Sequence, residues 1–147
     1  MRTIVISREV PGTPEALFAT ITTPATWEHW VATHKEFLTT PPERLEEGAR
    51  FTCEILLYGM VEEIEWVVAK LDEPRKVRLY GTARSGVHCD LTYWLTECEH
   101  GTEVTASVVL TGTTLKGQDA PLVEKHSHQQ LDCTLGQLGA MAGALAS

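Results

Sequence analysis

The amino-acid sequence predicts an α+β fold in which a curved antiparallel sheet packs against one long helix. Residues 51–110 alternate between apolar and polar side chains in segments separated by short turns, which is typical of strands joined as a meander. A long helical pattern follows over residues 119–146. Because the strands are long, we expect the sheet to twist and curl around the helix that covers one of its faces.

The first part of the chain predicts one strand and two short helices. Residues 3–10 alternate between apolar and polar side chains and precede a proline-glycine turn. Thr13-Pro14 is typical of a helix start, with threonine as the cap and proline at the first helical position. A second short helix begins at Pro24 and places Trp27 and Trp30 on one face. We expect these tryptophans to pack the short helices against the sheet, and the alternative is that they rim the mouth of a cavity.

Turn-forming residues separate the strands that follow. We expect residues 34–40 to be extended, and the five strands of the meander to lie within 51–58, 63–68, 77–80, 88–95 and 104–110. The predicted turns are at Gly59 and at residues 72–75, 85–86 and 100–102.

Length, charge and cysteine spacing narrow the classes of function. The 147 residues, 43% of them hydrophobic, fit one domain spanning residues 1–147. A net charge of −8 without a run of lysine or arginine disfavours binding to nucleic acid or to anionic membranes. Without a signal-peptide pattern or an apolar stretch long enough for membrane insertion, we expect a cytoplasmic protein. The four cysteines lack CxxC spacing, so we expect reduced thiols, no metal site and no cofactor.

The long helix carries polar residues within its apolar side. Asp119 is its predicted cap, and Ser127, Gln130 and Thr134 fall in the arc of the apolar residues. The apolar members of that arc are Ala120, Val123, Leu131, Leu135, Leu138, Met141, Ala142 and Leu145. A buried polar side chain needs a partner, which a ligand or water in a cavity supplies. We therefore predict that this helix lines a cavity, with residues 112–118 as a candidate lid.

Several local motifs, taken in order, resemble the START/Bet v 1-like superfamily. More narrowly, they resemble its bacterial SRPBCC-type members, the polyketide cyclase/dehydrase-like proteins. The matching residues are 13–18, Thr23-Pro24 with Trp27 and Trp30, 48–51, 72–77, and Leu95 with Gly101-Thr102. The resemblance implies a helix-grip fold, in which a curved antiparallel sheet grips the C-terminal helix around a hydrophobic cavity. It does not choose among carrier, cyclase, resistance protein and regulator.

The strand pattern predicts which side chains form the cavity wall. If the apolar side of each strand faces the helix, the ligand-binding residues are Phe51, Cys53, Ile55, Ile64, Trp66, Leu79, Leu91, Tyr93, Ser127, Gln130, Thr134 and Leu138, with Val104 and Ala106 beside them. Tyr93, Ser127, Gln130 and Thr134 are the groups expected to orient an apolar ligand. The alternative is a filled core in which these polar groups bond to each other or to the backbone.

Few residues are suited to catalysis. His126, with Gln130 one turn later, is the first candidate for proton transfer, and Tyr93 is the second. His126 and His128 are two residues apart on the helix, so they point in different directions and cannot chelate one metal ion. Glu54, Glu63 and Glu65 are predicted to form a solvated acidic face.

Three hypotheses of function follow. The first is binding of a hydrophobic small molecule such as a lipid, polyketide or aromatic metabolite. The second is a polyketide cyclase, aromatase or dehydratase, and the third is a protein-interaction or regulatory module. Gly136, Gly139 and Gly143 share the helix side opposite the apolar arc, which indicates either a weak helix end or a homodimer contact.

Overall fold

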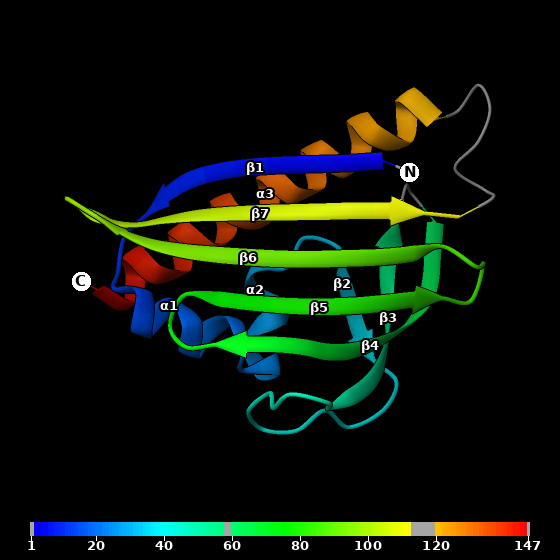
Figure 1. Cartoon of the computed structure of the whole chain (residues 1–147), viewed down its shortest axis with the longest axis horizontal. Coiled ribbons are helices and arrows are strands. Elements are labelled where there is room, and N and C mark those ends of the chain that lie inside the picture. Colours follow the sequence, from blue (N-terminus) through cyan, green and yellow to red (C-terminus); the bar gives the residue numbers. More distant parts are fainter. Residues whose placement is uncertain (1, 58–59, 113–119, 147) are drawn as a thin grey trace.

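The protein folds as a seven-stranded antiparallel sheet that curls around a long C-terminal helix (Figure 1). This computed structural model describes residues 2–57, 60–112 and 120–146. The strand order is β1-β7-β6-β5-β4-β3-β2. The strands are β1 (Arg2–Val10), β2 (His34–Phe37), β3 (Arg50–Leu57), β4 (Met60–Asp72), β5 (Lys76–Ala83), β6 (His88–Cys98) and β7 (Gly101–Thr111). The α+β helix-grip fold expected from the sequence is confirmed.

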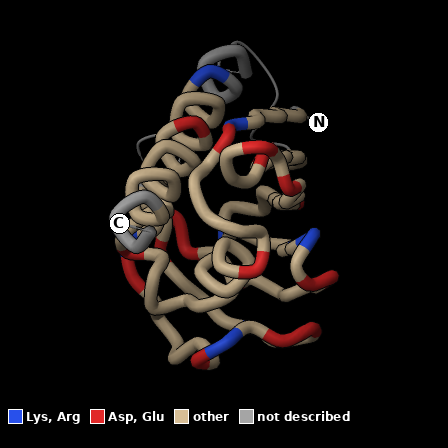
Figure 2. The backbone as a smooth tube through the Cα atoms, turned by 90° about the vertical axis from the view of Figure 1, so that its left-hand side faces the viewer, with Lys and Arg blue, Asp and Glu red and all other residues tan. Residues whose placement is uncertain are grey.

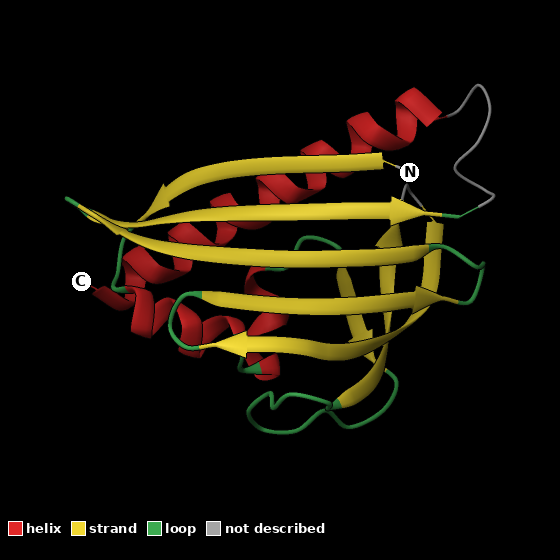
Figure 3. Ribbon diagram, viewed as in Figure 1, coloured by secondary structure: helices red, strands yellow, loops and turns green. Residues whose placement is uncertain are grey.

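Three short helical segments follow β1 and close one end of the sheet (Figure 3). Helix α1 (Pro14–Ile21) begins as predicted, because Thr13 Oγ1 accepts a hydrogen bond of 3.1 Å from the backbone N–H of Ala16. A 3₁₀ turn, η1 (Pro24–Thr26), leads into helix α2 (Trp27–Trp30). Each of these elements carries at least one buried side chain, so they extend the core beyond the sheet.

Helix α3 (Ala120–Ala146) forms a separate layer on one face of the sheet (Figure 2). It contacts β1, the strand at one edge of the sheet, and helix α2. Three positions on its apolar side, Leu131, Leu135 and Leu138, are buried against the sheet, as the helical periodicity predicts. Among the described residues, no helix is both long enough and apolar enough to cross a bilayer.

Alternation along the strands sorts side chains between the core and solvent. On β6, Tyr93 and Leu95 are buried whereas Trp94 is 40% exposed, and on β5 Leu79 is buried next to the exposed Tyr80. The predicted inner face of the meander is therefore correct. Three predicted features lie outside the described residues: the turn at Gly59, the cap at Asp119 and most of the connector considered as a lid, residues 113–118.

Candidate functional site

A cavity of about 90 Å³ lies between the inner face of the sheet, helix α2 and helix α3. Nine of the residues predicted to bind a ligand line it: Cys53, Ile55, Trp66, Leu79, Leu91, Tyr93, Ser127, Gln130 and Thr134. They come from strands β3 to β6 and from α3, so residues far apart in the sequence meet at this place. The wall also includes Val108 and Leu110 of β7 and Leu131 of α3.

Three residues predicted to line the cavity belong instead to the filled part of the core. Phe51, Ile64 and Leu138 are each at most 2% exposed and do not border the cavity. Phe51 is covered by the ring of Trp27, whose centroid is 5.5 Å away, and by Phe37 at 5.9 Å. The strand pattern correctly turned these side chains inward, but the space beside them is occupied by residues of other elements. The same holds for Val104 and Ala106.

Aromatic side chains from the first helices form one wall of the cavity. Trp27 and Trp30 are buried there, and their indole N–H groups donate to Ile21 O and to Thr26 Oγ1, both at 2.9 Å. These bonds fix both rings and leave their faces for apolar contact. The two tryptophans therefore pack the short helices, as predicted, and also line the cavity.

His34 is a cavity residue that the sequence interpretation missed. It lies at the start of β2, and its ring contacts those of Trp27 (6.2 Å between centroids) and Phe37 (4.5 Å). Its Nδ1 is buried without a hydrogen-bond partner among the described residues. Burial lowers the pKa of His34 below its ordinary value, against the opposing influence of Glu28. The sequence feature that could have indicated this role is a histidine that follows Trp27 and Trp30 closely and begins a short strand.

Two polar side chains of α3 form hydrogen bonds with backbone groups of other segments. Thr134 Oγ1 accepts a bond of 3.0 Å from the N–H of Ala32, and Gln130 Nε2 donates at 3.0 Å to the carbonyl of Leu56. They thereby join the helix to the segment before β2 and to β3. The alternative to a ligand site was a filled core in which these polar groups bond to the backbone. Both residues do form such bonds, and both also line the cavity.

The hydroxyl groups of Tyr93 and Ser127 make no hydrogen bond to a described residue. Tyr93 is 3% exposed, and its ring packs against Trp30 with 6.0 Å between centroids. Burial, followed by the neighbouring Cys89, raises the pKa of Tyr93 well above its ordinary value. The phenol is therefore protonated at neutral pH and offers an unpaired O–H at the cavity wall.

The described part of the cavity wall is uncharged at neutral pH. None of the described residues that line it is Asp, Glu, Lys or Arg. Burial raises the pKa of the Cys53 thiol to about 11 and that of Cys89 to about 12, so both thiols keep their protons. The part of the chain that the structure describes holds no group of three His, Cys, Asp or Glu side chains arranged to bind a metal ion.

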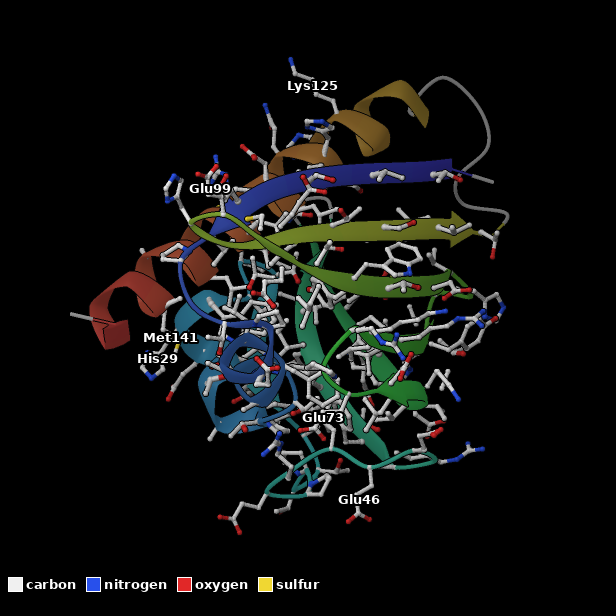
Figure 4. The ribbon with its side chains drawn as sticks, turned by 60° about the vertical axis from the view of Figure 1, so that its left-hand side comes forward. His29, Glu46, Glu73, Glu99, Lys125 and Met141 are labelled. Atoms are coloured by element: carbon white, nitrogen blue, oxygen red, sulfur yellow. The ribbon has the colours of Figure 1, made fainter. Side chains whose placement is uncertain are left out.

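His126 is not part of the cavity wall. Its side chain is exposed and does not border the cavity, in contrast to the predicted position beside it. The neighbouring Lys125 projects from the surface of α3 (Figure 4). The helix turns Ser127 and Gln130 inward but not His126, so Tyr93 is the one of the two candidate catalytic residues that reaches the cavity.

The glycines of α3 have different surroundings. A Cβ atom built on Gly136 would lie 2.5 Å from the Arg8 guanidinium, which forms a 3.5 Å ion pair with Asp132. Gly136 thus makes room for a side chain of β1 in the same chain. Gly139 has no atom within 4 Å of its Cβ position, and the surroundings of Gly143 lie outside the described residues. A homodimer contact here stays a prediction.

Comparisons with known proteins agree with the fold. Toxin Rv0910 of Mycobacterium tuberculosis (strain H37Rv) is 29% identical over 111 residues, which cover 76% of this chain and 77% of the toxin. Among solved structures, TTHA0849 from Thermus thermophilus has a TM-score of 0.77 at 16% identity, covering 99% of this chain and 100% of that one. CV1439 from Chromobacterium violaceum has a TM-score of 0.75 at 15% identity, covering 97% and 98%.

A family model identifies the family of this chain. The model described as polyketide cyclase/dehydrase and lipid transport matches residues 1–143, nearly the whole chain. This match agrees with the resemblance read from the sequence motifs and with the curled sheet around α3. The chain belongs to the polyketide cyclase/dehydrase and lipid transport family.

Proposed function

We propose that the protein binds an uncharged, hydrophobic small molecule in the cavity between the sheet, α2 and α3. The observation that carries this proposal is the wall itself, whose described side chains are mostly apolar and aromatic, carry no charge and include a buried nitrogen, His34 Nδ1, without a described hydrogen-bond partner. Ligand sites are typically apolar hollows with a few polar groups that orient the ligand. The family description, which includes lipid transport, supports the same class of function.

The size of the cavity favours a compact ligand. At about 90 Å³ it is smaller than the roughly 150 Å³ cavity that binds benzene in an engineered protein, and well below the roughly 300–1,000 Å³ of drug-sized sites. A single ring therefore fits after small shifts of the lining side chains, whereas a long acyl chain requires α3 to move. Binding would gain roughly 25 cal/mol for each Å² of apolar surface buried, less the ordering costs.

A pair of matched substitutions tests this function with toluene as the probe. Val108 lines the cavity, whereas Val61 on β4 is 48% exposed. Val108→Phe fills the cavity and Val61→Phe adds the same bulk outside it. Toluene should raise the melting temperature of the wild type and of Val61→Phe, because a ligand that binds only the native state stabilises it, but not that of Val108→Phe. Equal shifts in all three proteins, or none in the wild type, would contradict the proposal.

An enzyme of the cyclase or dehydratase type is the alternative, and His34 is the observation that favours it. A proton-transfer group must be able to change its protonation near neutral pH. The thiols and Tyr93 hold their protons, while His34 borders the cavity with a lowered pKa and is neutral there at pH 7. Turnover of a poly-β-ketone mimic that is lost in His34→Phe but not in His126→Phe would support this alternative.

A regulatory module is the third candidate function, and the likeness to a protein named as a toxin supports it. Native mass measurement of the purified protein separates the carrier from the module. A co-purified small molecule favours the carrier, and a stable complex with a second protein favours the module.

A further inference from the structure

His34 carries a buried polar atom that has no partner and belongs to a residue of the cavity wall. Its Nδ1 is enclosed by the protein and makes no hydrogen bond to a described residue. The other such atom among the described residues is Nδ1 of His88, which does not line the cavity. A buried polar atom without a partner costs free energy, and a ligand group that bonds to it removes that cost. His34 therefore indicates one polar group that a ligand of this cavity would carry.

Packing and hydrogen bonding hold His34 at the wall. Trp27 meets its ring edge to face, with 6.2 Å between centroids, and the ring of Phe37 lies at 4.5 Å. The backbone N–H of His34 donates to the carbonyl of Val31, and His34 is paired with Ile55 of β3. Val31 and Ile55 also line the cavity. The imidazole thus has a defined place in the wall.

The charge state of His34 decides which kind of group suits its free nitrogen. Burial lowers the pKa of His34 in spite of the opposing effect of Glu28, so the ring is neutral at neutral pH. A neutral imidazole has one nitrogen that carries a proton and one that accepts a hydrogen bond. His34 is half-buried and Nδ1 is its enclosed nitrogen, so the proton is better hydrated on Nε2. Nδ1 is then a bare acceptor, and a donor on the ligand suits it.

The size and charge of the cavity limit the rest of the ligand. The volume of about 90 Å³ admits about one ring. Trp27, Trp30 and Trp66 in the wall suit contact with an aromatic ring. An anionic ligand would lose its hydration without meeting a cationic side chain, because no described Lys or Arg lines the cavity. A neutral aromatic ring with one O–H group meets all three conditions.

We infer that the cavity takes a single-ring phenol, whose O–H donates to Nδ1 of His34. This inference rests on the proposed small-molecule function and goes beyond it by naming the class of ligand and the residue that recognises it. Phenol itself is the simplest member of the class. It is uncharged at neutral pH, since a phenolic hydroxyl such as that of tyrosine has a pKa of about 10.

The matched probes are phenol and toluene, which share a shape and differ in carrying an OH or a CH₃ group. Moving a hydroxyl from water into an apolar site without a hydrogen bond weakens binding by about tenfold or more. Calorimetry of the wild type should show similar affinities for both probes, because His34 replaces the lost water. His34→Phe should bind phenol about tenfold more weakly than toluene. His29→Phe, at a histidine of α2 whose side chain is 63% exposed, is the control and should behave as the wild type.

A measurement on the wild type tests the hydrogen bond directly. In nitrogen NMR of the histidine side chains, phenol should shift the signal of His34 Nδ1, because a hydrogen bond to a bare nitrogen changes its shielding. Toluene cannot donate such a bond and should leave this signal nearly unchanged. A protonated Nδ1, or equal effects of the two probes, overturns the assignment.

The outcomes separate this inference from the function on which it rests. A wild type that binds toluene but takes phenol tenfold more weakly, or an unchanged ratio in His34→Phe, overturns the phenol assignment and leaves the small-molecule site in place. Failure of both probes to bind overturns the small-molecule function as well. Val108→Phe fills the cavity and should abolish binding of both, so phenol binding that survives this change also overturns the assignment. If His34→Phe does not fold, the wild-type affinities and the Nδ1 signal decide.

Discussion

The hydroxyl oxygen of Thr134, in the middle of α3, accepts a hydrogen bond of 3.0 Å from the backbone N–H of Ala32. This bond joins the C-terminal helix to the segment between α2 and β2, which is distant in sequence. Thr134 is 4% exposed and borders the cavity. The same side chain therefore joins the helix to this segment and forms part of the cavity wall.

Substitution of Thr134 tests the structural part of this role. Thr134→Val keeps the shape and removes the acceptor, so the N–H of Ala32 loses its partner. We expect a loss of about 1–3 kcal/mol in the free energy of unfolding, measured by urea denaturation. Thr134→Ser retains the acceptor oxygen and should lose clearly less of that bond's contribution. A stable Thr134→Val protein would show that water replaces the threonine oxygen at no cost.

Gly81 on β5 allows the cavity residue Trp66 to lie against the sheet. A Cβ atom at position 81 would be 2.6 Å from Ile64 Cδ1 and 2.7 Å from Trp66 Cζ3. Gly81→Ala must displace the indole, so we expect a loss of about 1–3 kcal/mol in stability and a shift of the tryptophan fluorescence. Unchanged fluorescence would mean that the indole has room to accept a methyl group.

Gly139 provides the opposite case within α3. Nothing lies within 4 Å of its Cβ position, so alanine adds helix propensity without a clash. Gly139→Ala should raise the free energy of unfolding by about 0.5–1 kcal/mol, measured in urea at low protein concentration. If a homodimer uses this face, the same variant should weaken association in sedimentation experiments, since a side chain then separates the two helices.

Three carboxylates lie side by side on neighbouring strands, with Glu54 between Glu36 of β2 and Glu63 of β4. A hydrogen bond with Glu36, followed by smaller effects, raises the pKa of Glu54. The native state therefore binds this proton more tightly than the unfolded state does. Protonated Glu54 thus contributes to the stability of the native state. This contribution is fully present below the ordinary glutamate pKa and is lost as the pH rises through the raised pKa.

Glu54→Gln should therefore stabilise the protein at neutral pH, where the carboxylates repel one another, and the gain should shrink as the pH falls into the range of glutamate titration. Urea denaturation over a pH series measures this difference. Glu46→Gln, in the loop before β3 and pointing away from the body (Figure 4), is the control. A gain for Glu54→Gln that does not depend on pH would rule out charge repulsion as its cause.

His34 gives the opposite pH dependence. Its pKa is lowered in the native state by burial, so the unfolded state takes up the proton first as the pH falls. The contribution of neutral His34 is present above the ordinary histidine pKa and is lost as the pH falls toward the lowered value. His34→Phe keeps the ring beside Trp27 and should flatten this part of the stability profile. Parallel profiles for both proteins would show that His34 has an ordinary pKa.

The inward direction of the cavity side chains follows from local pattern alone. Because successive side chains of a strand point to opposite faces, the alternation in β3 to β6 was sufficient to place Cys53, Trp66, Leu79 and Tyr93 on the inner side. The periodicity of α3 likewise placed Thr134 toward the sheet. Both rules depend only on backbone geometry, so the sequence was enough.

Which inward side chains border empty space depends on residues far away in the sequence. Phe51 and Cys53 lie on the same face of β3, yet Trp27 covers the first and the cavity opens at the second. His34 becomes a cavity residue because a four-residue strand pairs with β3 beside the tryptophans, a register that local pattern does not encode.

The sequence by itself determined the order of the elements, the inner face of each strand and the apolar side of α3, because these follow from periods of two and 3.6 residues. Only the tertiary structure decided where the core is filled and where it is hollow, and which polar atoms are already bonded. Those outcomes depend on how side chains from separate elements share one volume, which no single segment specifies.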